Sequence, residues 1–177
     1  MYLKSLKNCR LAIGNYPYFD YDASGGGGKA SVIDNERGTS LLLKFHPNKF
    51  FIPPLNWKTT KILGLPMIPG IEINMILDKL EGILEPKNRE IILAFEARFI
   101  LKIFSTIEFP ELIINTELKN GEITSKLYKI KGEKISENGK VKLGGIAIIP
   151  PTSNVFLNIF LGLPNEALAI LECTIKT

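Results

Sequence analysis

The segment that most constrains the fold is Glu90–Phe104, in which the side chains follow a period of two. Every second position is apolar, and the positions between them mix apolar with charged side chains, including Glu96 and Arg98. Side chains alternate between the two faces of a β-strand, whereas a helix would spread the same apolar residues around its circumference. The segment therefore predicts a long strand that turns one face to a core.

Further strand-like runs are separated by glycine and proline along the chain, and helical signals are few. We expect an antiparallel β-barrel or a strongly curved β-sheet of about eight to ten strands, with two short helical segments. The helical segments are Asn56–Ile62 and Pro151–Phe160. The other predicted strands are Arg10–Ile13, Tyr16–Ala23, Lys29–Asp34, Ser40–Phe45, Ile71–Leu77, Leu80–Leu84, Val141–Ile149 and Asn165–Ile175.

Two Asn-Gly dipeptides predict tight turns between strands. Asn120-Gly121 joins two alternating runs and is the strongest short-range signal for a two-residue type I′ hairpin. That hairpin would place Leu118 opposite Ile123. The second dipeptide, Asn138-Gly139, leads into the last but one predicted strand.

An Ile-Pro-Pro…Leu-Gly-Leu-Pro element occurs twice, in residues 52–66 and 149–164. Each copy passes from Pro-Pro through a predicted helical turn to Leu-Gly-Leu-Pro, and then into an apolar strand. Gly64 and Gly162 suit the position just after a helix, because that position needs a positive φ. The proline two residues later prevents the helix from continuing. The matching frames predict an internal pseudo-repeat, although a good helix stop used twice would leave the same pattern.

Composition bounds the class of protein. With 177 residues, 45% hydrophobic and 23% charged, residues 1–177 are expected to form a single β-rich domain with no membrane-spanning segment. Met1–Arg10 lacks the apolar block of a secretory signal, so we expect a cytoplasmic protein in which Cys9 and Cys173 are free thiols. A net charge of +4, with lysine far commoner than arginine, does not favour nucleic acid as a partner.

Motifs for familiar chemistries are incomplete. Gly25–Gly28 before Lys29 lacks two required positions of the P-loop, so we interpret it as a flexible or tightly turning connection. A small anion nest formed by its backbone N–H groups is the functional alternative. His46 is the only histidine, which argues against catalytic dyads and zinc. Asp20 and Asp22 share a strand face and fit exposed decoration better than acid–base or metal chemistry. We therefore predict no catalytic residue, no metal and no cofactor.

The candidate ligand-binding residues are Glu96, Arg98, Phe51 and Trp57. Glu96 and Arg98 would form a polar spot in a cavity if their face were inside a barrel, and a surface ion pair if it were outside. Phe51 and Trp57 belong to the apolar segment Phe50–Trp57, which would rim a cavity, cover a barrel end or pack on the core.

The chain contains the strings Tyr21-Asp22-Ala23-Ser24 followed by four glycines, Pro53-Pro54-Leu55-Asn56-Trp57, two Leu-Gly-Leu-Pro motifs and Leu80-Glu81-Gly82-Ile83-Leu84. Together these strings resemble an uncharacterised family of cyanobacterial and plastid proteins. The resemblance covers nearly the whole chain, implies a lineage, and transfers no activity or catalytic residue. More loosely, the long strands around Leu80–Phe104 are similar to bacterial isoprenoid-binding β-barrels.

Apolar strand faces and few acid–base groups predict a non-catalytic protein that binds an apolar small molecule, such as a lipid, isoprenoid or pigment. The alternative is a structural or assembly factor that docks on a protein partner through Phe50–Trp57. An enzyme of unknown type, with chemistry led by Asp20, Asp22 or Glu96, comes third.

Overall fold

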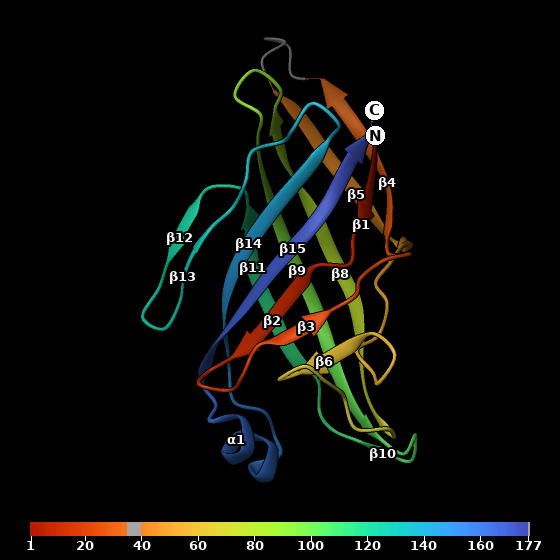
Figure 1. Cartoon of the computed structure of the whole chain (residues 1–177), viewed down its shortest axis with the longest axis vertical. Coiled ribbons are helices and arrows are strands. Elements are labelled where there is room, and N and C mark those ends of the chain that lie inside the picture. The colour runs from red at the N-terminus through yellow and green to blue at the C-terminus, as the bar shows by residue number, and fades with distance from the viewer. Residues whose placement is uncertain (35–39, 177) are drawn as a thin grey trace.

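Backbone hydrogen bonds connect the long strands in a closed ring (Figure 1). The computed structural model describes residues 1–34 and 40–176. Eight antiparallel strands form the ring, and the last of them pairs again with the first. This confirms the predicted mainly β, curved antiparallel sheet. In pairing order the strands are β1 (Tyr2–Ser5), β4 (Gly27–Asp34), β5 (Leu41–Phe51), β8 (Ile71–Glu85), β9 (Glu90–Ile103), β11 (Leu112–Lys119), β14 (Lys140–Ile149) and β15 (Asn165–Lys176).

The ring is not an even barrel, because two strands share one edge of β15. β1 pairs with residues 173–176 of β15, and β2 (Cys9–Ile13) pairs with residues 167–170. Beyond β2 the sheet continues as a branch through β3 (Phe19–Tyr21), β6 (Thr60–Ile62) and β7 (Leu65–Pro66). Among the described residues, the first half of β8 has no strand partner on the edge that faces the branch. Its backbone bonds there, within these described residues, are those of an isolated bridge between Ile73 and Leu55, a residue of the segment between β5 and β6.

The two ends of the molecule therefore differ. At the end that carries both chain termini, which we call the terminal end, the ring is continuous (Figure 1). The opposite end, which we call the helical end, carries the branch and the helix α1 (Val155–Leu161). The short strand β10 (Ile107–Glu108), which pairs with the last residues of β9, also lies there.

The predicted long strand is present as β9 and pairs with β8 along its whole length, from Ile71 with Ile103 to Glu85 with Glu90. A bulge at Asp78 interrupts β8, which explains why the sequence indicated two segments there. The bulge places the Asp78 carboxylate beside Arg98 of β9, which donates to it from both Nε and Nη2 at 2.9 Å. A strand irregularity and a cross-strand ion pair thus coincide.

Buried side chains form one dense core, two thinner walls and a small fourth cluster of Ala12, Tyr128 and Leu168. The dense core fills the terminal end, where Leu43, Ile91 and Leu93 have no solvent exposure. At the helical end, one buried cluster contains Tyr21, Leu55 and Met67, and a separate one contains Ile114, Ala147 and Ile149. The interior is therefore packed at one end and divided at the other.

One helix, α1, is present among the described residues, so the prediction of a helical segment at Asn56–Ile62 is wrong. The Asn56 carboxamide accepts a hydrogen bond from the Lys58 N–H at 3.0 Å, and the Asn56 carbonyl accepts from the Thr59 N–H at 3.2 Å. These local bonds close a turn in place of a helix. Residues 60–62 then form β6.

The two Leu-Gly-Leu-Pro strings have different structures, so the predicted structural pseudo-repeat is wrong. In the first, Leu63 and Gly64 are the two-residue tip of the β6–β7 hairpin, both with positive φ. In the second, Gly162 is the left-handed cap that ends α1, and its N–H donates to the Asn158 and Ile159 carbonyls. The repeated string supplies a glycine with positive φ in both places, as expected, and nothing more.

The predicted hairpin at Asn120-Gly121 is also wrong. β11 pairs with β9 and β14, whereas β12 (Glu122–Thr124) pairs with β13 (Lys129–Lys131) in a separate two-stranded sheet. The buried Asn120 side chain accepts from the Ile91 N–H at 3.1 Å and donates to the Arg89 carbonyl at 2.8 Å. These tertiary hydrogen bonds hold the start of β9, and they override the local turn preference.

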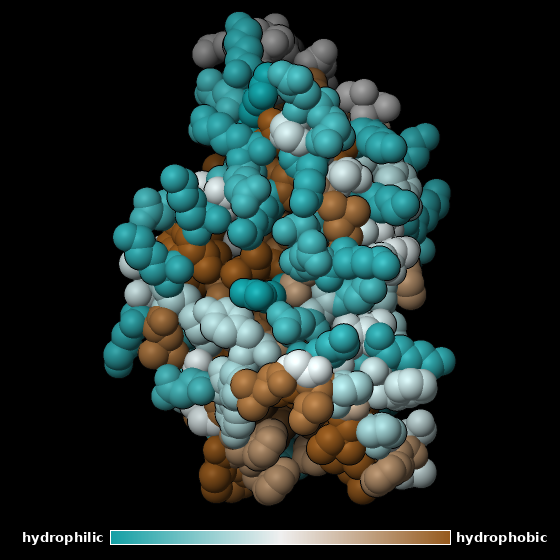
Figure 2. All heavy atoms as spheres, viewed as in Figure 1, coloured by the Kyte–Doolittle hydropathy of each residue, from teal (hydrophilic) through white to brown (hydrophobic). Residues whose placement is uncertain are grey.

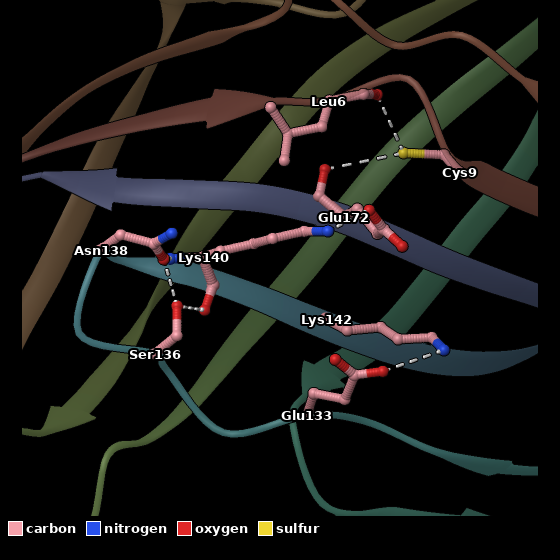
Figure 3. Close-up of polar contacts among 8 residues, drawn as sticks. All are labelled: Leu6, Cys9, Glu133, Ser136, Asn138, Lys140, Lys142 and Glu172. Atoms are coloured by element: carbon pink, nitrogen blue, oxygen red, sulfur yellow. Dashed lines mark hydrogen bonds and ion pairs between the residues drawn. The ribbon is translucent and has the colours of Figure 1, made fainter.

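The second predicted turn, Asn138-Gly139, is confirmed (Figure 3). Gly139 has a φ of 80°, and the Ser136 N–H donates to the Lys140 carbonyl at 2.8 Å just before β14 begins.

The four-glycine run begins β4 and marks a close crossing of three strands. A methyl group on Gly27 would lie 2.0 Å from the Leu3 carbonyl oxygen in β1. One on Gly28 would lie 2.8 Å from the Lys49 carbonyl oxygen in β5. The absence of side chains therefore permits close backbone packing, which is a structural role.

Replacing Asn120 with Ala should lower the free energy of unfolding by about 1–3 kcal/mol, because the Ile91 N–H and the Arg89 carbonyl would lose their buried partners. Urea-induced unfolding measures this. The control is Asn88→Ala, which removes an exposed hydrogen bond to Glu85 and should cost less than about 0.5 kcal/mol. Equal losses in the two variants would contradict the structural role of Asn120.

Candidate ligand-binding cavity

A cavity of about 540 Å³ lies inside the sheet. Its volume is within the range of roughly 300–1,000 Å³ that is typical of small-molecule sites. Inward side chains of β9, such as Phe95 and Phe99, line one side, and Tyr21, Leu55 and Met67 line another. The cavity thus occupies the space that separates the two buried clusters of the helical end.

The lining is apolar and contains no charged side chain among the described residues. Two of its hydroxyl groups are turned to the backbone: Thr116 Oγ1 donates to the Ile146 carbonyl at 2.8 Å, and the Tyr21 hydroxyl donates to the Pro53 carbonyl. Burial raises the pKa of Tyr21 far above its ordinary value, so this hydroxyl stays protonated. The walls therefore offer a bound molecule dispersion contacts and no ionised group.

The mouth of the cavity is at the helical end. Some lining residues there are also open to solvent, among them Ile68 at 67% exposure and Phe156 at 63%. Lining residues toward the terminal end, such as Leu93, are fully buried. Figure 2 shows the change from a hydrophilic surface around the terminal end to apolar side chains around the mouth.

Local hydrogen bonds fix α1 beside the mouth. Asn154 caps the helix by accepting from the Leu157 N–H at 2.8 Å, and the Asn158 side chain exchanges hydrogen bonds with the Thr152 backbone at 2.7 and 2.8 Å. Leu157 is the only residue of α1 that is buried. One side chain thus anchors a helix whose other apolar side chains are more exposed.

Aromatic side chains from three segments meet at the mouth, and we call Tyr16, Phe109, Phe156 and Phe160 the aromatic rim. The ring of Phe156 stacks on Phe160 at 5.9 Å and approaches Phe109 at 6.3 Å between ring centroids. Tyr16 lies 5.8 Å from Phe160, and its hydroxyl donates to the Phe160 carbonyl. The rim therefore joins α1 to the β2–β3 turn and to the segment after β10.

None of the four predicted ligand-binding residues lines this cavity. On β9 the odd-numbered side chains face inward, so Glu96 and Arg98 belong to the outer face. Arg98 binds Asp78 and also Glu111, at 3.1 Å, while Glu96 pairs with Lys79 at 3.6 Å. Of the two arrangements expected for Glu96 and Arg98, the structure has the surface one, although they do not pair with each other.

Phe51 and Trp57 point away from the interior, with 58% and 51% of each residue exposed. Other members of the same segment do reach inward, since Phe50, Ile52 and Leu55 line the cavity. The apolar segment therefore contributes to the cavity, through different residues from those predicted.

The other residues considered for chemistry, Asp20, Asp22 and His46, do not line the cavity. Asp20 pairs with Arg10 at 3.1 Å. Asp22 accepts from the Ser24 hydroxyl and N–H, and these bonds lower its pKa. His46 lies in β5, with Nε2 3.2 Å from Ser31 Oγ in an exposed contact. Within residues 1–34 and 40–176, no three His, Cys, Asp or Glu residues are grouped closely enough to hold a metal ion.

Both cysteines are buried free thiols, as predicted. Cys9 Sγ donates to the Leu6 carbonyl at 3.4 Å and to the Glu172 carbonyl at 3.8 Å, where β1 gives way to β2 (Figure 3). Burial raises the pKa of Cys9 to about 11 and that of Cys173 to about 12. The Glu172 carboxylate, which pairs with Lys140 at 3.0 Å, is a smaller contributor to the same upward shift of both pKa values. Such thiols are poor nucleophiles near neutral pH.

Sequence reasoning missed the aromatic rim. Its members come from three segments that are distant in the sequence, and each looks like an ordinary loop or helix residue. For Tyr16, Phe156 and Phe160 one available signal is the distribution of charge, because residues 11–19 and 143–165 contain no charged side chain. Phe109, beside Glu108, carries no such signal.

No known protein family, curated protein or solved structure matches the chain in our comparisons. Among the described residues, no helix is long and apolar enough to cross a membrane.

Native protein should react very slowly with a thiol reagent such as Ellman's reagent at mildly alkaline pH. Burial and the raised pKa values of Cys9 and Cys173 leave little accessible thiolate in the folded state. In denaturant both thiols should react, and Cys173→Ala should retain one reactive thiol. Rapid reaction of the folded protein would contradict the buried positions.

Proposed function

We propose that the protein is a non-catalytic binding protein for an apolar small molecule, such as a lipid, isoprenoid or pigment, held in the cavity. The observation that carries the proposal is a cavity of about 540 Å³ with apolar walls and a mouth at the helical end. A tightly packed interior would have left no space for a ligand and would have contradicted the proposal.

The energetics favour an occupied cavity. An unfilled apolar cavity costs free energy roughly in proportion to its volume, because the lining atoms lose packing partners. A ligand that fills the space recovers those contacts and removes its own apolar surface from water, at roughly 25 cal/mol per Å². The hollow helical end is thus better explained by a ligand than by stability.

The lining also limits which ligands fit. A charged group inside would lose its hydration without gaining a partner, because no ionised side chain lines the described walls. The apolar body of the ligand would therefore lie inside, and any polar group would remain at the mouth beside the aromatic rim. The same walls supply no ionised acid or base, so binding without catalysis is the function that this geometry supports best.

Ala169→Phe should weaken the binding of a neutral apolar dye such as Nile red at least about tenfold, since the added ring would occupy the cavity that Ala169 lines. Fluorescence titration measures the effect. Ala94→Phe is the matched control, because Ala94 lies on the outer face of β9 and should leave binding unchanged.

Equal dye binding by the two variants would locate the dye outside the cavity and count against the proposal. The natural ligand should be found by native mass spectrometry of gently purified protein, as a mass that solvent extraction removes. Ala169→Phe should carry less of it than Ala94→Phe, provided that both variants unfold at similar temperatures.

A second candidate function is docking on a protein partner through Phe50–Trp57. The observation in its favour is that Phe51 and Trp57 are exposed aromatic side chains on one short segment, and aromatic residues are enriched at protein interfaces. Lys58 Nζ lies 5.2 Å from the centre of the Trp57 ring, which keeps part of this surface polar.

Trp57→Ala should abolish co-purification of that partner and leave the midpoint of thermal unfolding nearly unchanged, because Trp57 is half exposed. Tyr2→Ala, which truncates an exposed aromatic residue on β1, is the control. Retention of the partner by Trp57→Ala would exclude this segment as the docking site.

A further inference from the structure

The helical end exposes large apolar side chains from three separate segments. α1 presents Val155 and Ile159, and the tip of the β6–β7 hairpin presents Leu63. The turn between β9 and β10 presents Phe104. Leu63 and Ile159 are 79% and 77% exposed, which is unusual for such side chains in water. They lie around the mouth of the cavity, where Figure 2 shows apolar side chains gathered.

Charged residues are sparse at this end. Four stretches that contribute to this end contain no Asp, Glu, Lys or Arg, namely residues 11–19, 62–71, 103–107 and 149–165. Charge is nevertheless present where β10 pairs with β9, as an ion pair between Lys102 and Glu108 at 2.9 Å. The ion pairs on the sheet lie on its outer faces, as in Arg98 with Asp78. A surface in which apolar side chains predominate, and on which Lys102 and Glu108 are paired with each other, suits contact with an apolar phase, in which an unpaired charge would be costly.

Two of the exposed side chains occupy turn positions that ordinarily select other residues. Leu63 has a φ of 52° and Phe104 a φ of 51°. Asparagine and glycine adopt this conformation at low cost, whereas large side chains seldom do. Turn stability therefore does not account for Leu63, whose side chain points into solvent. The residue costs local conformational energy and supplies an apolar group at the tip of a hairpin.

We propose that the helical end docks on the surface of a lipid bilayer, inserts these side chains among the acyl chains, and faces the cavity mouth toward the membrane. Side chains that project from separate turns suit a fluid phase, whereas a protein partner would need a matched rigid surface. Tyr16 and Tyr18 are exposed at the same end, and their amphipathic rings suit the level of the lipid headgroups.

The docking proposal goes beyond ligand binding and stands without it. Val155, Ile159 and Leu63 do not line the cavity, so changing them alters the outer surface alone. The cavity mouth opens among these residues, so docking would also give an apolar ligand a path between membrane and cavity that avoids water.

Flotation with neutral phosphatidylcholine vesicles tests the proposal. The wild-type protein should float with the vesicles at both low and high ionic strength, because apolar insertion is not screened by salt. Val155→Ser combined with Ile159→Ser should lower the vesicle partition coefficient at least about tenfold. The matched control is Ile83→Ser combined with Ile92→Ser, which changes two exposed, paired residues on the outer face of β8 and β9 and should float like the wild type.

Leu63→Asn provides a second, independent variant. Asparagine suits the φ of 52° at this position, so the variant should melt at the same temperature as the wild type or higher, while its vesicle partition coefficient falls several-fold. A misfolded variant could not give that combination of results.

Three outcomes would overturn membrane docking. The first is wild-type protein that does not float, and the second is equal loss of binding in the control variant. The third is a wild-type dimer in sedimentation velocity that Val155→Ser with Ile159→Ser makes monomeric, since a second copy would then cover this end. Nile red binding separates the two proposals, because the α1 variant should retain it whatever its behaviour with vesicles.

Discussion

Pairing between β1 and the end of β15 closes the sheet, and the rest of the structure depends on how far that closure extends. It holds at the terminal end, where the ring leaves no free edge between these strands and the apolar side chains pack densely. Farther along β15 the partner becomes β2, and the wall continues through β3, β6 and β7. Because this branch bonds little to β8, the two walls stay apart and the interior is hollow.

The alternation of side chains along each strand separates the charges from the cavity. On β9, Phe95 and Phe99 face inward, while Glu96 and Arg98 pair with Lys79 and Asp78 on the outer face. Exposed pairs of this kind contribute little stability, so their main effect is to keep the outside of the sheet hydrophilic. The inside, in contrast, interacts with its contents through apolar contact alone. This division is the basis of the proposed binding function and of the proposed selection of ligands by polarity.

How much could be predicted from sequence depended on whether the deciding interactions were local. The strand at Glu90–Phe104 was predictable because its alternation reflects one buried face. The hairpin prediction at Asn120-Gly121 was wrong because the Asn120 side-chain amide forms hydrogen bonds with the start of β9, which is distant in the sequence. Leu-Gly-Leu-Pro permits both a hairpin tip and a helix stop. The cavity was anticipated only as a possibility, since hollowness depends on pairing between distant strands, and its aromatic rim joins three segments.

Both termini lie at the end opposite the mouth, where residues 2–5 pair with residues 173–176 (Figure 1). A tether attached to either terminus would therefore leave the opening unobstructed. The same arrangement sets an orientation: a protein fixed by its termini to a support, or fused there to another domain, would present its open end outward. Reporter groups or affinity tags belong at these positions, because they would disturb neither the contents of the molecule nor the surface around its entrance.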